Sequence, residues 1–352
     1  MKFTENVLLA HHTTFKIGGP ARFFCIVSNE DELVQAVAFA KKEKRRIMIL
    51  GGGSNVLFAD AGFSGVVAKM EMKGIEILDP HPKTGQASAD ESVFVSCQAG
   101  EMWDDLVDRT VSLGLYGLEN LSAIPGTVGA APVQNIGAYG TELSDTVEKV
   151  RALDTETMAF VELSNAECGF GYRDSLFKQT KGRYVITRVD FKLRKNGTPN
   201  LGYKDLKEYF RSKGAKDADR VPSLQEVRDA VIDIRWKKLP DWKLWGTAGS
   251  FFKNPVIAAH RFEALKKKYP GIPGYPEPDG RVKVSAGWIL DNVCKVKGVM
   301  PGKVGTYENQ ALVIIAKPGA TAAEVIEFTE HLLNQVEKET TIRMEGEVEW
   351  VN

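Results

Sequence analysis

Two glycine-rich segments hold the residue types best suited to contacting a phosphate. Residues 51–55 read Gly-Gly-Gly-Ser-Asn directly after a strand expected at 46–50, and residues 125–130 read Pro-Gly-Thr-Val-Gly-Ala. Because glycine has no Cβ, successive backbone N–H groups in such turns can approach a pyrophosphate. The first turn alone fits a ligand-free connection equally well. The second segment shifts the balance towards a phosphate-bearing ligand.

The chain around the second segment is unusual for a surface loop. Residues 121–140 are rich in glycine, alanine and proline and contain no charged side chain. Long loops in compact proteins are commonly functional, and solvated ones are commonly polar. We therefore expect this backbone to pack against a ligand.

Several familiar site motifs are absent or incomplete. Neither glycine segment matches Gly-x-Gly-x-x-Gly, and no helix is expected after residue 55, which disfavours a doubly wound dinucleotide fold. Residues 298–304 are one residue short of a nucleotide-triphosphate loop and place Val304 where serine or threonine must reach magnesium. Residues 249–251 lack the second glycine of a nucleophile elbow. No metal site is expected, because metal-ligand spacing is missing among the histidines, His11, His12, His81, His260 and His331.

The composition points to a small-molecule partner. The chain has 352 residues, 43% hydrophobic and 26% charged, which predicts two or three globular domains. Its 46 basic and 46 acidic side chains cancel, so we expect neither nucleic-acid nor membrane-surface binding. No signal peptide or membrane span is evident. The four cysteines form no Cys-x-x-Cys pair and are interpreted as idle thiols of a cytoplasmic protein, Cys25, Cys97, Cys168 and Cys294.

The elements that must position these segments alternate between strands and helices. A capping box at 28–31 begins an amphipathic helix, and further strands are expected at 66–70, 74–78, 93–99 and 184–193, with a helix at 101–113. The turn cluster at 195–199 is the best domain boundary. Beyond it, capping boxes at 223–226 and 321–324 begin helices. A final strand is expected at 341–351, with Glu345, Glu347 and Glu349 on one face.

A family resemblance connects these features. Residues 247–255, Thr-Ala-Gly-Ser-Phe-Phe-Lys-Asn-Pro, resemble the proton-donor segment of the UDP-N-acetylenolpyruvoylglucosamine reductases, flavoenzymes of peptidoglycan synthesis. The resemblance continues, in order along the chain, at residues 13–20, 51–55, 124–140, 171–175 and 345–348. The length and Tyr203 resemble the longer subclass, which folds a tyrosine loop over its substrate. Related sequences often have asparagine at the positions of Thr13 and Thr247, which affects local loop contacts.

The resemblance implies an α+β fold in two parts. Residues 1–195 would form a two-lobed FAD-binding domain of the vanillyl-alcohol-oxidase-like type, with lobes at about 1–70 and 71–195. Residues 196–352 would form a smaller α+β substrate-binding domain, whose C-terminal strand could return to the flavin site. We expect a cytoplasmic monomer.

The implied reaction passes hydride from NADPH to FAD and then to the enolpyruvyl ether of a UDP-sugar. Arg173 would stabilise the negative charge that spreads into the substrate carboxylate, because a guanidinium can grip a carboxylate with two hydrogen bonds. Ser250 would protonate the adjacent carbon, which requires rigid alignment of a weak acid. Glu347 completes the catalytic set by resemblance, since alternation alone does not separate it from Glu345 or Glu349.

The resemblance also assigns binding residues. The substrate would contact Tyr203, Lys238, Asn254 and Gln310, although Lys238 could equally be a plain cation at a helix end. FAD would lie along the two glycine segments, namely Gly51, Gly52, Gly53, Ser54 and Asn55 together with Pro125, Gly126, Thr127, Gly129 and Ala130.

Two other functions stay open at this point. A related flavin fold could serve an oxidase of sugars or hydroxy acids. Alternatively, the chain could be a nucleotide-sugar binding module without catalysis, which would purify colourless. The segment around Ser250 and the presence of Arg173 argue against the oxidase.

Overall fold

A computed structural model describes residues 1–78, 92–212 and 220–352. The chain divides into two compact units that are interleaved in sequence. Unit 1 comprises residues 1–7, 22–52 and 64–235, and unit 2 comprises residues 8–21, 53–63 and 236–352. Within the described ranges, none of the helices combines the length and apolar character needed to cross a membrane.

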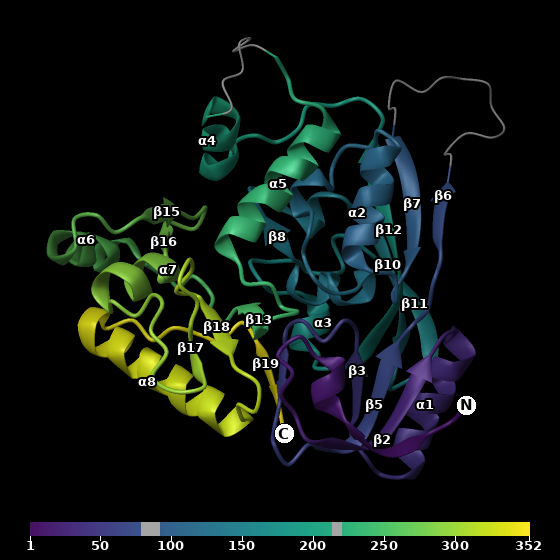
Figure 1. The fold of residues 1–352 in the computed structure, drawn as a ribbon. Coiled ribbons are helices and arrows are strands. Elements are labelled where there is room, and N and C mark those ends of the chain that lie inside the picture. The colour runs from purple at the N-terminus through teal and green to yellow at the C-terminus, as the bar shows by residue number, and fades with distance from the viewer. Residues whose placement is uncertain (79–91, 213–219) are drawn as a thin grey trace. The chain divides into compact units, whose positions relative to one another are not determined.

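The larger sheet of unit 1 is antiparallel and has five strands in the order β11-β10-β12-β7-β6. Its long central strands, β10 (Val147–Asp154) and β12 (Tyr184–Arg194), lie side by side in Figure 1. The remaining members are β6 (Ile75–Leu78), β7 (Ser92–Gln98) and β11 (Ala159–Ser164). Alternate residues of β12 and β7, such as Val189, Phe191 and Val95, are fully buried and form one face of the core.

A second sheet of unit 1 has four strands in the order β1-β2-β5-β3. They are β1 (Thr4–Leu8), β2 (Pro20–Val27), β3 (Ile47–Leu50) and β5 (Phe63–Met70), and a few end residues of these strands belong to unit 2. β3 and β5 are parallel. Helix α1 (Glu30–Lys42) begins at Asn29, whose side chain accepts a hydrogen bond from the Glu32 N–H. It buries Leu33, Ala36, Val37 and Ala40 in the core of this unit.

Helices α2 (Trp103–Ser112) and α5 (Leu224–Lys238) lie alongside each other in Figure 1. Arg228 of α5 is buried and forms ion pairs with Asp104 and Asp108 of α2 at 2.7 and 3.1 Å. Two shorter helices of unit 1 are α3 (Leu176–Gln179) and α4 (Lys204–Ser212). A buried charge is costly unless it is paired, so the ion pairs of Arg228 with Asp104 and Asp108 tie α5 to unit 1.

Unit 2 is built on small sheets. One has the order β13-β18-β17 and the other β14-β16-β15, and both are antiparallel. β19 (Glu349–Val351) pairs in parallel with β4 (Val56–Phe58). The remaining strands are β13 (Gly246–Ser250), β14 (Val256–Ala258), β15 (Gly274–Pro276), β16 (Arg281–Val284), β17 (Val304–Thr306) and β18 (Val313–Ala316).

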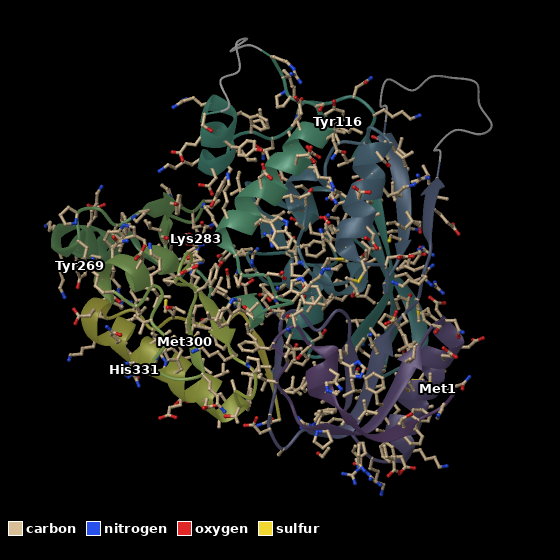
Figure 2. The ribbon with its side chains drawn as sticks, viewed as in Figure 1. Met1, Tyr116, Tyr269, Lys283, Met300 and His331 are labelled. Carbon is tan, nitrogen blue, oxygen red and sulfur yellow. The ribbon has the colours of Figure 1, made fainter. Side chains whose placement is uncertain are left out.

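The helices of unit 2 are α6 (Ala259–Lys268), α7 (Ala286–Trp288) and α8 (Ala322–Thr340). Helix α8 begins with the predicted capping box between Thr321 and Glu324 and buries Val325, Leu332 and Val336. Figure 2 labels Tyr269 just beyond α6, and its hydroxyl lies 3.3 Å from the Glu339 carbonyl of α8. This contact joins the two helices.

The predicted α+β class is confirmed, and so are the helices and strands expected between residues 46 and 113. The capping box at Ser223 and Glu226 is also formed, with hydrogen bonds in both directions. The final strand is shorter than predicted, since only residues 349–351 form a strand. Ile342 and Met344 are buried, but Trp350 is 42% exposed, so the predicted alternation breaks. Backbone pairing with a neighbouring segment, described below, replaces a regular ladder there.

Candidate active site

In unit 1, the start of the glycine turn packs directly on the second glycine segment. A Cβ placed on Gly52 would lie 2.8 Å from Gly126 Cα, and one on Gly51 would lie 2.4 Å from Thr127 Oγ1. The Gly126 backbone cannot move aside for a Cβ, so position 52 requires glycine, whereas a side chain at position 51 would force the Thr127 side chain to shift. The two segments that the sequence singled out are therefore in contact.

Thr127 lies at this contact and is 6% exposed. Its Oγ1 is buried without a hydrogen-bond partner in the described structure. A buried hydroxyl without a partner costs free energy, and native proteins rarely leave one unexplained. Backbone held close by glycine, together with a hydroxyl donor, fits the phosphate chemistry of a dinucleotide. The residues of this cradle are thus suited to FAD.

The rest of the turn belongs to unit 2. Gly53 has φ +64°, and a Cβ there would lie 2.1 Å from the His12 carbonyl oxygen, so only glycine fits. The Gly53 carbonyl accepts a hydrogen bond from the Thr14 N–H at 3.0 Å. Asn55 Nδ2 donates to the Glu347 carbonyl oxygen at 3.1 Å. The turn therefore holds the backbone of a predicted catalytic residue.

Arg173 sits in a tight turn of unit 1. Residues Gly171 and Asp174 exchange backbone hydrogen bonds around it, and Arg173 itself has φ +54°. Its guanidinium donates to the Gly137 carbonyl at 2.8 Å and lies 3.5 Å from the Asn135 carbonyl oxygen. A side chain anchored to backbone carbonyls is oriented before any ligand binds, which is what a carboxylate clamp requires.

Asn135 fixes the loop that receives the guanidinium. Its φ is +44°, in the left-handed region that asparagine tolerates better than most residues. Its amide donates to Glu142 Oε2 at 2.8 Å and to the Gly171 carbonyl at 3.1 Å. Ser175 Oγ adds a hydrogen bond to the Val133 carbonyl at 2.6 Å. Residues 133–142 and 171–175 therefore form one rigid cluster around Arg173.

Tyr203 precedes α4 and is 45% exposed. Its ring meets that of Tyr139 edge-on, with centroids 5.4 Å apart and an angle of 83° between the planes. Tyr139 belongs to the uncharged segment 121–140, which was predicted to pack against a ligand, but Tyr139 itself was not predicted as a site residue. Burial raises the pKa of the Tyr139 hydroxyl to about 12, so the phenol is neutral at physiological pH.

Ser250, in unit 2, ends a strand that is interrupted by a bulge. Thr247 pairs with Ile315 and Ser250 with Val313, so the register shifts between the two pairs. Gly249 takes up the irregularity with φ +74°. Thr14 Oγ1 secures the start of the bulge by donating to the Thr247 carbonyl at 2.6 Å. Bulges turn side chains away from the regular face of a sheet, and this one sets the direction of Ser250.

Glu347 lies beside the segment that follows Ser250. Its N–H donates to the Phe251 carbonyl at 2.8 Å, and Phe252 forms a bridge with Gly346. Among the three glutamates of the predicted face, Glu347 is half-buried, whereas Glu345 and Glu349 are exposed. Glu345 pairs with Lys253 at 3.4 Å. Geometry thus separates Glu347 from its neighbours, which alternation alone could not do.

The predicted substrate residues of unit 2 lie on three neighbouring segments. Asn254 Oδ1 accepts a hydrogen bond from the Ala286 N–H at 3.0 Å, which orients its amide. Lys238 is the last residue of α5, as the alternative reading anticipated. Asn309 Nδ2 donates to the Lys237 carbonyl at 3.0 Å, so the loop carrying Gln310 contacts this helix end. Lys238 and Gln310 are therefore on adjoining backbone.

Each unit assembles part of the predicted set. Unit 1 groups Arg173 and Tyr203 around residues 133–142, while unit 2 groups Ser250, Glu347 and Asn254 on a continuous stretch of paired backbone. Sequence reasoning missed Asn135 and Tyr139. Their only signal was a position within the uncharged segment, because Asn135 acts through hydrogen bonds and Tyr139 through a ring contact with residues far along the chain.

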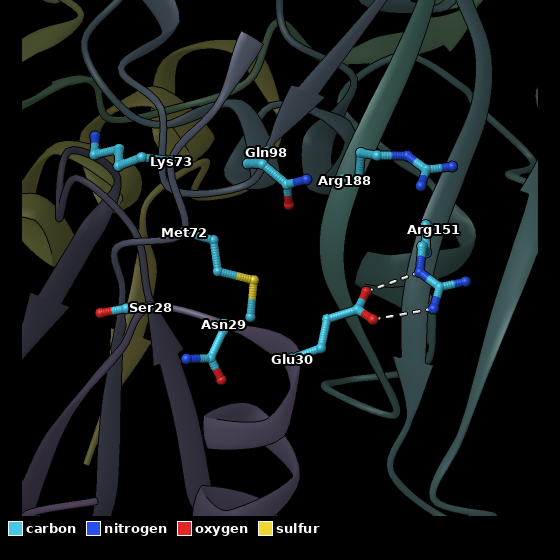
Figure 3. A pocket seen from close by; sticks show the side chains of 8 residues that line it. All are labelled: Ser28, Asn29, Glu30, Met72, Lys73, Gln98, Arg151 and Arg188. Atoms are coloured by element: carbon cyan, nitrogen blue, oxygen red, sulfur yellow. Dashed lines mark hydrogen bonds and ion pairs between the residues drawn. The ribbon is translucent and has the colours of Figure 1, made fainter. Parts of the chain in front are cut away.

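A cavity of about 440 Å³ in unit 1 lies apart from all these residues. Figure 3 shows its lining, in which Arg151 grips Glu30 with two hydrogen bonds of 2.8 and 3.0 Å. Those bonds hold the pKa of the Glu30 carboxyl below its usual range. Arg188 pairs with Asp190 and Glu162. The charges of Glu30, Arg151 and Arg188 are thus compensated, and none of the predicted site residues lines this cavity.

Residues 1–78, 92–212 and 220–352, which the structure describes, contain all four cysteines and four of the five histidines. No group of three or more potential metal ligands occurs there, and His81 lies outside them. All four cysteines are free and buried. Burial raises the pKa of Cys25 and Cys294 to about 11 and that of Cys168 to about 12. Such thiols are protonated and unreactive at neutral pH.

Comparisons with known proteins show what this chain is similar to. Residues 21–160 match a family model described as an FAD binding domain, and residues 240–351 match the C-terminal domain of UDP-N-acetylenolpyruvoylglucosamine reductase. A reductase of that name from Neisseria meningitidis is 44% identical over 97% of this chain and 96% of its own length. One from Ralstonia nicotianae is 41% identical over 96% of both chains. The crystal structure of the Thermus caldophilus reductase covers all of both chains with 26% identity and a TM-score of 0.66.

The match to an FAD binding domain over residues 21–160 shows the class to which this chain belongs, that of FAD-binding proteins. The similarity to the reductases is more specific, because it extends over nearly the whole chain and so includes both units. The chain belongs to the UDP-N-acetylenolpyruvoylglucosamine reductase family.

Proposed function

We propose that this chain reduces UDP-N-acetylglucosamine enolpyruvate to UDP-N-acetylmuramate with NADPH, a step of peptidoglycan precursor synthesis. The relatives that are named for this reaction extend along nearly its whole length. The observation that carries the proposal is the bulge that sets Ser250 beside backbone shared with Glu347. This arrangement suits an enzyme that must deliver a proton precisely, and neither a simple oxidase nor a binding module needs it.

FAD supplies the hydride relay between NADPH and the enolpyruvyl ether when it is bound. The backbone N–H groups of Gly51, Gly52 and Gly126 would hold the pyrophosphate, and the Thr127 hydroxyl, buried without a partner, would donate a hydrogen bond to it. The full cofactor set is that of the sequence prediction, namely Gly51 to Asn55 with Pro125, Gly126, Thr127, Gly129 and Ala130.

Arg173 holds the substrate carboxylate. Hydride addition to the vinyl carbon leaves negative charge that spreads towards this carboxylate. The guanidinium is already oriented by the Gly137 carbonyl, so little reorganisation is needed as charge develops. Lysine would place a single ammonium there and could not reproduce the planar pair of donors.

Ser250 donates the proton to the carbon next to the carboxylate, and the bulge at Gly249 fixes the direction of transfer. Glu347 assists by accepting a hydrogen bond from the enolic carboxyl or by orienting the proton path. Its partial burial favours this role over Glu345, which already pairs with Lys253.

The nucleotide and diphosphate are bound by Tyr203, Lys238, Asn254 and Gln310. We assign residues 1–195 to FAD binding, in lobes of about 1–70 and 71–195, and residues 196–352 to substrate binding. The protein acts as a cytoplasmic monomer that binds neither nucleic acid nor membrane. The balance of 46 basic and 46 acidic side chains supports the absence of nucleic-acid and membrane-surface binding.

An anaerobic titration tests the reaction directly. The purified protein should be yellow, should bleach with NADPH and should recover its colour when the enolpyruvyl nucleotide-sugar is added. Recovery only on admission of oxygen, with peroxide formed, would indicate an oxidase instead. A colourless protein that still binds the nucleotide-sugar would indicate a binding module.

A further inference from the structure

Two asparagines of unit 1 join the Tyr203 segment to the loop that carries Tyr139. Asn120 is 1% exposed and lies in the 3₁₀ turn Glu119–Leu121. Its Nδ2 donates to the Tyr139 carbonyl at 2.9 Å and to the Asn200 carbonyl at 2.8 Å. The Asn120 amide therefore connects the backbone at Tyr139 with the backbone at Asn200, which are 61 residues apart in the sequence.

The second asparagine continues the connection. Asn200 Nδ2 donates to the Gly140 carbonyl at 2.8 Å, and its Oδ1 accepts the Gly202 N–H at 3.0 Å. Gly140 has φ +81°, and a Cβ there would lie 3.4 Å from Asn200 Nδ2. Asn200 is thus bonded on one side to the residue after Tyr139 and on the other to the residue before Tyr203.

The orientation of Asn120 is fixed by these bonds. Both of its partners are carbonyl oxygens, so the nitrogen must face them, and an exchange of oxygen and nitrogen would lose both bonds. Its Oδ1 is buried without a partner. A buried acceptor left unpaired is unfavourable, so the two donated bonds must outweigh it.

We infer that Asn120 and Asn200 are positioning residues that set the edge-to-face pair of Tyr139 and Tyr203 for the nucleotide-sugar. The inference rests on the proposed function, in which Tyr203 contacts the substrate. Neither asparagine touches the substrate itself. Each fixes backbone adjacent to a tyrosine, so an aromatic surface is arranged before the substrate arrives and less conformational freedom is lost on binding.

The test uses the FAD-loaded enzyme and separates its two half-reactions. Asn200 is exposed, so the Asn200→Ala variant should fold. The substitution removes the side-chain hydrogen bonds to Gly140 and Gly202. The nucleotide-sugar KM should rise about tenfold, while flavin reduction by NADPH stays within about twofold of wild type. Asn196→Ala, at another exposed asparagine just before this segment, is the matched control and should leave KM unchanged.

A double-mutant cycle distinguishes positioning from an unrelated defect. If Asn200 acts through Tyr203, the Asn200→Ala/Tyr203→Ala double variant should have the KM of Tyr203→Ala alone. Additive effects, or equal losses in both half-reactions, would overturn the inference. Asn120→Asp keeps the shape but places a carboxylate against two carbonyl oxygens, and it should raise KM at least as much.

The outcomes also separate this inference from the proposed function. If Tyr203→Ala raises KM but Asn200→Ala does not, the positioning role is wrong and the substrate role of Tyr203 stands. If Tyr203→Ala leaves KM unchanged, both assignments fail. If wild type does not reduce the nucleotide-sugar at all, the proposed function is wrong, and the positioning role falls with it.

Discussion

Asn55 and Glu347 are joined by a hydrogen bond of 3.1 Å from Asn55 Nδ2 to the Glu347 carbonyl oxygen. The Glu349 N–H returns a bond of 3.0 Å to the Asn55 carbonyl. The residue that ends the glycine turn therefore fixes the backbone on both sides of Val348. The sequence predicted one role for each residue, cofactor binding for Asn55 and catalysis for Glu347, but not that one holds the other.

Replacing Asn55 with aspartate should slow substrate reduction. The side chain keeps its size but loses the N–H donor, and a carboxylate then faces the Glu347 carbonyl oxygen. We expect about a tenfold slower reoxidation of reduced flavin by the enolpyruvyl substrate, per bound flavin, from the loss of about one hydrogen bond. Stopped-flow measurement with flavin content determined beforehand provides the rate. Asn196→Asp is the control, and an unchanged rate in Asn55→Asp would remove this link from the mechanism.

Gly52→Ala should weaken FAD binding. The new Cβ would lie 2.8 Å from Gly126 Cα, and backbone cannot move aside as a flexible side chain can. The two glycine segments must then separate, which enlarges the cradle. The flavin released from purified protein on denaturation, measured as a ratio to protein, should be well below that of wild type. Gly302→Ala is a matched control because nothing lies within 4 Å of its Cβ, and equal flavin content in both variants contradicts the cradle.

Ser250→Ala should affect only one half-reaction. Flavin reduction by NADPH does not use the proton, so its rate should stay near wild type. Substrate reduction should fall by at least about a hundredfold, the usual contribution of a positioned proton donor. Rapid mixing of each half-reaction provides both rates. Ser112→Ala, on the exposed side of α2, controls for loss of a hydroxyl. Equal losses in the two half-reactions would exclude Ser250 as the donor.

Arg173→Lys should retain the fold but lose turnover. Both residues accept the φ of +54° equally poorly, so the backbone strain is unchanged. A lysine ammonium cannot donate a hydrogen bond to the Gly137 carbonyl and at the same time present a planar pair of donors to the substrate carboxylate. We expect kcat/KM to fall about a hundredfold. Steady-state kinetics, with Arg109→Lys on the exposed face of α2 as control, measures it, and wild-type kinetics in Arg173→Lys would remove Arg173 from the site.

Local signals in the sequence were enough for most of the fold. Strand β12 was predicted from the alternation of apolar side chains, and the capping box of α8 from two side chains three residues apart. Both are present in the structure. The prediction of a final strand over residues 341–351 was wrong in its length, because the alternating pattern was interpreted as one continuous strand. Residues 345–347 instead pair with residues 251–253, which lie far away in the sequence, and alternation does not encode such a contact.

The site was less accessible to sequence reasoning than the fold. The glycine pattern identified both halves of the cradle, since a missing Cβ is visible in the sequence. The Thr127 hydroxyl became informative only when its burial and lack of a partner were known. Asn120 and Tyr139 likewise depend on hydrogen bonds between distant segments. Resemblance to a family named the catalytic residues, whereas physical pattern alone left Glu347 among three equivalents.

The last prediction concerns the buried ion pair that ties α5 to α2. Burial by itself would raise the pKa of Asp104, but hydrogen bonds from Arg228 and from the Ala123 N–H bring it below the usual value. Since the folded pKa is lowered, the pair stabilises the fold above about pH 4, the unfolded value, and this stability is lost as pH falls through the folded pKa. Arg228→Met should therefore cost about 2 kcal/mol at pH 7, because Asp104 is only partly buried.

Urea unfolding of the full-length protein at pH 7 and at stepwise lower pH measures this cost. The difference between wild type and Arg228→Met should narrow as the pH falls below about 4, since protonated Asp104 no longer needs the guanidinium. Arg220→Met is the control, because the Arg220–Glu226 pair is exposed and such pairs contribute less than about 1 kcal/mol. A cost independent of pH would mean that packing of the Arg228 stem, and not its charge, holds α5 in place.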